Sequence, residues 1–288
     1  MPTNGTIVDR LTVELNTAER KAVARLYSNE IIDDTIVEQI TYYSDNLKIK
    51  GHIARPREDG QYPVLIWNRG GTGDRGAITD LTAHLILAST AQWGYVVLGT
   101  QYRGNMGSEG ADEWGGRDIR DAHHLLDVAE RMPQCDMSRI AVEGASRGGI
   151  TTYRLLAMDD RFRCAIVHAG VVDLFDLCDK KGRFALFCDN LLSGMTLDEQ
   201  REETRKRSAA YFVQELPKST PILLLHGDSD TVISISQSEA MAAALRQQGI
   251  PHQLEIIPGG THVALKDGSY RVIDEFRKDW LEKHLKSV

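Results

Sequence analysis

Short apolar runs alternate with amphipathic stretches along most of this 288-residue chain. Continuous apolar runs of strand length occur at YPVLIWN (62–68), GYVVLGT (94–100), SRIAV (138–142), RCAIVHA (163–169), PILLLHG (221–227) and HQLEIIP (252–258). Apolar positions recur at helical spacing at LTAHLILASTAQ (81–92), RDIRDAHHLLDVAERM (117–132), ITTYRLLAM (150–158), ISQSEAMAAALRQQG (235–249) and YRVIDEFRKDWLEKHL (270–285). Buried strands that alternate with helices predict an α/β fold, with a mostly parallel sheet covered by helices on both faces.

Three stretches depart from this rhythm. Residues 35–56 alternate apolar and polar positions around the turn sequence SDN, which predicts an antiparallel hairpin. Residues 1–34 form an N-terminal extension with one helical stretch, TAERKAVARLY. Residues 174–216 contain no strand and are mostly helical and charged. We interpret this last segment as a helical insertion in a single domain spanning 1–288, either a cap over the site or a helical connection on its rim.

The composition of the chain limits the kinds of partner that the protein can bind and the compartments in which we expect it. The net charge is −7, which argues against a nucleic-acid partner. No apolar run is long enough to span a membrane, and the first residues lack the pattern of a signal peptide. The four cysteines show no metal-ligand spacing, so we expect no metal and no organic cofactor. We predict reduced thiols in a cytoplasmic protein, with a Cys178–Cys188 disulfide as the alternative.

A serine lies between two glycines at the junction of a strand and a helix. The sequence EGASRGG places Ser146 two residues from Gly144 and two from Gly148. A strand that turns sharply into a helix leaves no room for bulky neighbours, and it lifts the central side chain out of the sheet. The alternative is an ordinary glycine-rich turn. We predict that Ser146 is a nucleophile.

A serine nucleophile needs a base and a carboxylate that orients the base. In an open parallel sheet these groups gather at the carboxyl ends of the strands. Asp230 follows the strand PILLLHG, and His262 follows the last strand. The order serine, acid, histidine is that of the α/β-hydrolase fold. Asp173 is a rival acid; Asp228 is interpreted as a turn former, and His123, His124, His168 and His226 as structural residues.

Several motifs together carry a resemblance to a known family. They are YRG (102–104), GGRDIRD (115–121), GASRGG (144–149), RSAAYF (207–212), HGDSDTV (226–232) and PGGTH (258–262). Over residues 40–285 the chain resembles the catalytic module of the prolyl oligopeptidase family of serine hydrolases. The resemblance implies the α/β-hydrolase fold, with Asp230 as the acid and His262 as the base.

The oxyanion hole requires two hydrogen-bond donors. One is predicted to be the backbone N–H of Arg147, and the other the N–H of Gly70 or Gly71 in the loop after the first buried strand. Many relatives carry histidine in place of Arg69, proline in place of Thr72 and an aromatic residue in place of Arg147, so the second donor stays open. The Arg147 side chain is expected to pair with a nearby acid, the alternative being a substrate carboxylate.

These features predict a serine hydrolase that forms an acyl-enzyme on Ser146. The larger peptidases of the family carry an N-terminal propeller that filters substrates, and residues 1–34 hold no repeat of that kind. A small-molecule esterase is therefore slightly favoured over a peptidase of short peptides. A non-catalytic binding module is the alternative from another class. If residues 174–216 form a cap, Phe184, Phe187 and Leu191 are expected to line the acyl pocket. The oligomeric state stays open.

Overall fold

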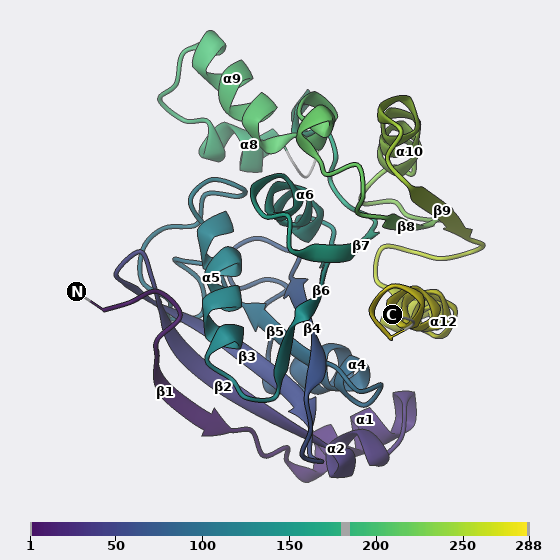
Figure 1. Cartoon of the computed structure of the whole chain (residues 1–288). Helices are drawn as coiled ribbons and strands as arrows, with labels where there is room; N and C mark the ends of the chain where they lie inside the picture. The colour runs from purple at the N-terminus through teal and green to yellow at the C-terminus, as the bar shows by residue number, and fades with distance from the viewer. Residues whose placement is uncertain (1, 180–184, 287–288) are drawn as a thin grey trace.

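A nine-stranded mixed sheet organises the molecule (Figure 1). The computed structural model describes residues 2–179 and 185–286. The sheet order is β1-β2-β3-β5-β4-β6-β7-β8-β9. The strands are β1 (Ile7–Thr12), β2 (Thr35–Ser44), β3 (Leu47–Pro56), β4 (Tyr62–Asn68), β5 (Val96–Thr100), β6 (Cys135–Ala145), β7 (Phe162–His168), β8 (Ile222–Gly227) and β9 (His252–Ile257).

The strands divide into an antiparallel part and a parallel part. β1, β2, β3 and β5 pair antiparallel, whereas β5, β4, β6, β7, β8 and β9 run parallel. The 35–56 hairpin is confirmed as β2 and β3; its turn residues Asp45 and Asn46 both have positive φ, as a tight hairpin turn requires. The parallel part brings the carboxyl ends of β6, β8 and β9 to one edge of the sheet. The predicted α/β-hydrolase fold is confirmed.

Helices cover both faces of the sheet because the central strands are apolar on both sides. Along β4, Val64 and Ile66 face one hydrophobic cluster, whereas Leu65 and Trp67 face the other. The first cluster is closed by α5 (Ile119–Glu130), α6 (Gly148–Met158) and α10 (Ser236–Gln248). The second is closed by α1 (Thr17–Leu26), α2 (Glu30–Asp34), α4 (Ser89–Ala91) and α12 (Tyr270–Leu281). Figure 1 shows α5 and α6 on the side of the sheet opposite α4 and α12.

Two features of the fold were not anticipated from the sequence. Strand β1 pairs along β2, although its residues are mostly exposed and show no apolar alternation. The helix predicted over 81–92 is a continuous run of α3 (Asp80–Thr82), the π-helical segment η1 (Ala83–Ala88) and α4. Two short elements follow β9 and α12, namely α11 (Ala264–Asp267) and the π-helical η4 (Glu282–Lys286).

The segment between β7 and β8 is helical, as predicted. It comprises α7 (Leu174–Asp179), α8 (Ala185–Leu191), α9 (Leu197–Arg207) and the 3₁₀ turns η2 (Ala209–Tyr211) and η3 (Val213–Glu215). In Figure 1 these elements lie at the top of the view, beyond α6. We refer to residues 174–216 as the helical segment.

A buried ion pair ties the sheet to the last long helix. The Arg277 guanidinium on α12 donates two hydrogen bonds to Glu143 on β6, at 2.7 and 2.9 Å, and one to Asp274. Arg277 and Glu143 are both buried. Removing one partner of such a pair leaves an uncompensated charge in the core, at a cost of about 3–5 kcal/mol.

Candidate active site

Ser146 occupies a strained turn between β6 and α6. Its φ is +56°, in the left-handed region that non-glycine residues rarely adopt. Its backbone N–H donates to the carbonyl of His168 at 2.9 Å, and its carbonyl accepts from the N–H of Val171 at 3.0 Å. The flanking glycines are required, since a Cβ on Gly148 would lie 2.0 Å from the Asn68 carbonyl oxygen and one on Gly144 2.4 Å from Thr152 Oγ1. The turn therefore has the geometry of a nucleophile elbow.

His262 and Asp230 lie together at the same edge of the sheet. Nδ1 of His262 is 2.7 Å from Oδ2 of Asp230, and the side chains are 16% and 1% exposed. The other oxygen, Oδ1, accepts from the N–H groups of Val232 and Ile233 at 2.7 and 3.0 Å. This bonding fixes the carboxylate and turns Nε2 of His262 away from it.

The surroundings of Asp230 keep it ionised. Burial opposes ionisation, but hydrogen bonds from His226 and His262 outweigh it and hold the pKa of Asp230 well below its usual range. A carboxylate that stays charged can stabilise the imidazolium that forms when His262 takes a proton.

The rival groups have other partners. Asp173 Oδ1 accepts from the N–H groups of Phe175 and Asp176, at the start of α7, and its Oδ2 accepts from the Tyr211 hydroxyl. Asp228 Oδ1 accepts from the N–H of Gly259 and so holds the turn before His262, as expected of a turn former.

The other histidines are embedded in the fold. His226 is fully buried between Ser238 Oγ and the Ile233 carbonyl, at 2.7 and 3.0 Å. Burial first, and then the neighbouring His262 and His226, lower the pKa of His168 to about 4, so it stays neutral. On α5, His123 pairs with Asp159, and His124 bonds Ser44 Oγ. None of these four is placed as a base.

Of the predicted oxyanion donors, Arg147 directly follows Ser146 in the chain, and Gly70 lies against it. A Cβ added to Gly70 would lie 3.0 Å from Ser146 Cβ and 3.7 Å from Ser146 Oγ, so the two loops are in contact. Gly71 has φ +81°, and a Cβ there would be 1.9 Å from the Arg75 carbonyl oxygen. In the described part of the chain, the N–H groups of Gly70, Gly71 and Arg147 donate to no protein acceptor. Backbone N–H groups in the loop next to Ser146 are therefore available to bind a substrate oxygen.

The Arg147 side chain pairs with acids of the protein, as expected. Its guanidinium binds Asp112, with Nη1 to Oδ2 at 2.8 Å, and Asp118 at 2.7 Å. It stacks over the rings of Tyr102 and Trp114, at 4.7 and 5.3 Å from their centroids. Sequence reasoning missed both partners, because Asp112 lies in a glycine-rich loop and Asp118 at the start of α5, with no spacing that marks them as partners of Arg147.

Two of the three predicted pocket residues pack inward from the helical segment. Phe187 lies against Trp114, with ring centroids 4.3 Å apart. Phe187 and Leu191 contact a buried apolar cluster formed by Trp114, Ile150, Val171, Leu174, Leu177 and Ile233. Val171 follows β7 and donates its N–H to the Ser146 carbonyl, and Ile233 follows Asp230, so this cluster adjoins the catalytic edge. The third residue, Phe184, lies outside the described residues.

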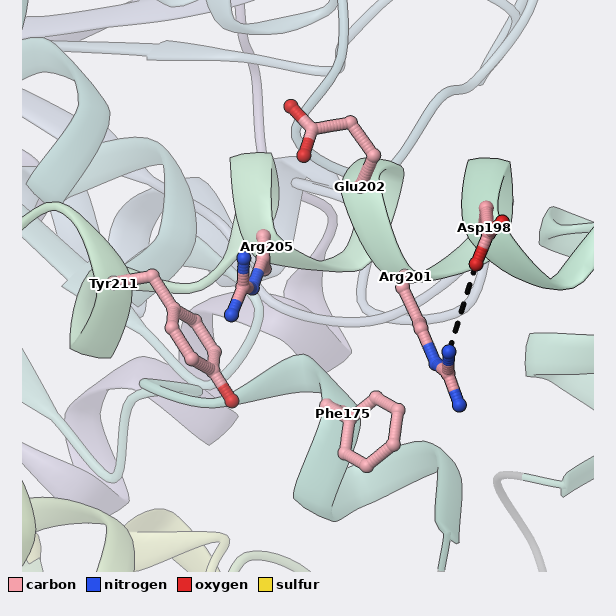
Figure 2. Close-up of a pocket in the computed structure, with 6 residues that line it drawn as sticks. All are labelled: Phe175, Asp198, Arg201, Glu202, Arg205 and Tyr211. Atoms are coloured by element: carbon pink, nitrogen blue, oxygen red, sulfur yellow. Dashed lines mark ion pairs between the residues drawn. The ribbon is translucent and has the colours of Figure 1, made fainter.

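A cavity opens in the helical segment between α7, α9 and Tyr211 (Figure 2). It has a volume of about 410 Å³ and is lined by Phe175, Asp198, Arg201, Glu202, Arg205 and Tyr211. Arg201 pairs with Asp198 at 3.5 Å, and Arg205 lies over the Tyr211 ring. Ser146, Asp230 and His262 are not among the described residues that line it, so this cavity is separate from the catalytic edge.

The prediction of four reduced thiols is wrong for one pair. Cys178 on α7 and Cys188 on α8 form a disulfide, while Cys135 and Cys164 are free and buried. The sequence misled because the ten-residue separation carries no signal by itself; folding brings the two Cα atoms to 5.6 Å.

The described residues contain neither a potential metal-ligand cluster nor a membrane-spanning helix. No group of three or more potential metal-ligating side chains occurs within residues 2–179 and 185–286. In the same ranges, no helix has the length and apolar character needed to cross a membrane.

Comparison with known proteins identifies the relatives of this chain. The sequence model of the prolyl oligopeptidase family matches residues 82–288. An uncharacterized peptidase of Bacillus subtilis, YtmA, is 27% identical over 84% of this chain and 92% of its own length. Dipeptidyl-peptidase 5 of Porphyromonas gingivalis is 27% identical over 78% of this chain, which spans only 34% of that relative.

Solved structures share the fold at low sequence identity. The acylaminoacyl peptidase complex with Z-Gly-Gly-Phe-chloromethyl ketone superposes with a TM-score of 0.73 at 22% identity, over 91% of this chain and 44% of that one. A Mycobacterium tuberculosis puromycin-hydrolyzing peptidase gives 0.72 at 19% identity, over 88% and 46%. The relatives named are peptidases, so the comparisons favour the peptidase alternative over a small-molecule esterase.

Proposed function

The chain belongs to the prolyl oligopeptidase family and is a serine hydrolase; from that premise we propose that it is a peptidase of short peptides. The observation that carries the catalytic assignment is the 2.7 Å contact between His262 Nδ1 and Asp230 Oδ2, at the edge where Ser146 is raised on its elbow. We assign Ser146 as the nucleophile, His262 as the base and Asp230 as its orienting acid.

In the proposed mechanism, His262 moves the proton in both steps. Because Nδ1 is held by Asp230, Nε2 takes the proton from Ser146 Oγ as the oxygen attacks the peptide carbonyl. The negative oxygen that forms is bound by the backbone N–H of Arg147 and by that of Gly70 or Gly71. Nε2 then protonates the leaving amine, the C–N bond breaks, and an ester to Ser146 remains. Water repeats the sequence and releases the acid, which restores the serine.

We further propose that the apolar cluster beside the catalytic edge selects the acyl residue. Phe187 and Leu191 reach it from α8, and Val171 and Ile233 reach it from the loops that hold Ser146 and Asp230. An apolar side chain at the cleaved residue suits such a lining. The helical segment thereby acts as a cap in a single domain, with its inner face on the site and its charged α9 facing solvent.

The location of the protein stays a prediction. A cytoplasmic protein was expected, and the Cys178–Cys188 disulfide weighs against a reducing compartment. Partners other than a short peptide are not proposed.

The experiment that tests the function compares two substrate panels and one variant. Aminoacyl-nitroanilides with apolar residues should be cleaved, and nitrophenyl esters with the same acyl groups serve as the esterase arm. Ser146→Ala should abolish both activities and labelling by a fluorophosphonate, with an unchanged melting temperature. Ester cleavage without any amide cleavage would return the function to an esterase. Undiminished labelling of Ser146→Ala would remove the catalytic assignment, and a wild type that neither labels nor cleaves would favour a binding module.

A further inference from the structure

We propose that Arg69 and Arg147 are positioning residues of the oxyanion hole. The Arg69 guanidinium holds the Gly70 carbonyl and so directs the Gly71 N–H, and the Arg147 guanidinium holds the Gly71 carbonyl and so fixes the loop 69–73 beside Ser146. Together they keep the oxyanion donors of this loop facing the substrate carbonyl at Ser146. The proposal rests on the proposed hydrolase function and concerns how its oxyanion donors are aimed.

Both arginine side chains are buried, although removing a charged guanidinium from water costs free energy. Arg69 is 0% exposed and Arg147 is 1% exposed, and they are among the largest fully buried side chains. A buried charge is costly unless hydrogen bonds or an opposite charge compensate it. The hydrogen-bond partners of the two guanidinium groups therefore show which part of the structure each arginine holds in place.

Arg69 is compensated by backbone carbonyls. Nη1 donates to the Gly70 carbonyl at 3.1 Å, and Nη2 to that of Gly73 at 2.8 Å. Nε and Nη2 both donate to the carbonyl of Gln101, at the end of β5. Burial lowers the pKa of Arg69. No carboxylate is among its hydrogen-bond partners in the described residues, so the loop is wrapped around a cation and attached by it to the sheet.

Arg147 holds the same loop from the elbow side. Asp112 and Asp118 fix its guanidinium, and Nη1 also donates to the Gly71 carbonyl at 3.3 Å. Nearby, Trp114 Nε1 donates to Thr72 Oγ1 at 3.1 Å, and the Tyr102 hydroxyl donates to the Arg69 carbonyl at 3.3 Å. Because Arg147 directly follows Ser146, this contact sets the loop relative to the nucleophile.

Because the peptide bond is planar, a hydrogen bond that fixes a carbonyl group also fixes the direction of the next N–H group. No cis peptide bond occurs in the described residues, and in a trans peptide the C=O and the next N–H point in opposite directions. Tyr102 holds the Arg69 carbonyl and thereby turns the Gly70 N–H the other way. Arg69 holds the Gly70 carbonyl and thereby turns the Gly71 N–H the other way. Neither N–H group donates to a protein acceptor within residues 2–179 and 185–286, and Gly70 lies against Ser146.

A misdirected donor is costly in catalysis. Removing one oxyanion donor in a serine hydrolase lowers kcat by about 10²–10³-fold, because the donor must already face the developing charge. If one of the two arginines is replaced, the loop 69–73 keeps its backbone N–H groups, but these groups are no longer held in the direction of the substrate carbonyl. We therefore expect a loss of about 10–100-fold in kcat when Arg147 is replaced, with little change in KM.

The test compares Arg147→Gln with Arg277→Gln. The control removes another buried arginine held by two carboxylates, Glu143 and Asp274, with no bond to the loop. For Arg147→Gln, the Ki of a peptide boronic acid should rise by the same factor as kcat/KM falls, because the tetrahedral adduct uses the oxyanion donors. The pH at which kcat/KM reaches half its maximum should not move, since His262 and Asp230 are intact. Arg277→Gln should lower the melting temperature without either kinetic change.

Each outcome separates this proposal from the proposed function. If Arg147→Gln loses no more activity than Arg277→Gln at a similar loss of melting temperature, Arg147 is structural only and the proposal is overturned. If Arg147→Gln does not fold, Asp112→Asn loosens the same clamp and should show the parallel change in kcat/KM and Ki at a smaller size; an unchanged Ki overturns the proposal. A wild type that reacts with neither fluorophosphonate nor boronic acid overturns the hydrolase function, and this proposal with it.

Discussion

The catalytic edge of the sheet and the helical segment above it are stabilised in different ways. At the edge, Ser146, Asp230 and the glycines of the elbow are fixed by backbone hydrogen bonds and by contacts that admit no Cβ. In the helical segment, large apolar side chains remain exposed, with Leu197 at 72% and Phe175 at 48%. The difference indicates a rigid frame at the catalytic edge and fewer geometric constraints in the helical segment, to which the proposal assigns substrate choice.

The largest expected effect contrasts Asp230 at the catalytic edge with Asp173, which directly precedes the helical segment. Asp230→Asn should lower kcat by about 10⁴-fold, because an amide leaves His262 in the wrong tautomer. Asp173→Asn should lower it by less than about 10-fold, since an asparagine Oδ1 can still accept from the first amides of α7. Steady-state rates on one nitroanilide decide the ranking. The reverse ranking would move the acid to the start of the helical segment.

The second prediction contrasts a glycine of each region through stability. Gly148→Ala places a Cβ 2.0 Å from the Asn68 carbonyl oxygen and should lower the free energy of unfolding by about 3 kcal/mol. In Gly194→Ala the new Cβ meets no described atom within 4 Å, so only the backbone strain at φ +77° should lower the free energy of unfolding, by about 1 kcal/mol. Urea unfolding followed by circular dichroism measures both. Equal losses would mean that the elbow tolerates movement.

The third prediction concerns the disulfide. Replacing Cys178 and Cys188 together with serine should destabilise the helical segment by about 2–3 kcal/mol, because the closed loop no longer limits its unfolded states. Amide hydrogen exchange should speed up in α7 and α8 and stay unchanged in β6 and β8. Wild type in the presence of a reductant is the matched control and should behave like the variant. Unchanged exchange in α7 would show that packing alone holds the segment.

The smallest expected effect concerns selectivity. Phe187→Ala removes the ring that packs on Trp114 and should change the relative kcat/KM of large and small apolar acyl residues by about 10-fold. Leu197→Ala, which removes an exposed side chain, is the control and should leave the ratio unchanged. An unchanged ratio with a lowered melting temperature in Phe187→Ala would assign α8 to the scaffold.

Sequence reasoning succeeded where a local pattern has one physical solution. Apolar runs located the six parallel strands β4 to β9, and the glycines around Ser146 located the elbow. It failed where partners meet only through the fold, as with Arg147 and its acids Asp112 and Asp118. Strand β1 was missed because an exposed edge strand such as Ile7–Thr12 needs no apolar alternation. Cys178 and Cys188 were misassigned because redox state was inferred from compartment rather than from geometry.

The ion pair between Glu143 and Arg277 also constrains biosynthesis. The two residues are 134 positions apart, so Glu143 and the serine elbow leave the ribosome long before Arg277 does. At about 5–20 residues per second, this interval lasts about 7–27 s. Throughout it, burying β6 would enclose an unpaired carboxylate. Glu143 can therefore gain its buried partner only after α12 has been synthesised, so the pairing that completes this part of the core follows the synthesis of the elbow by that interval.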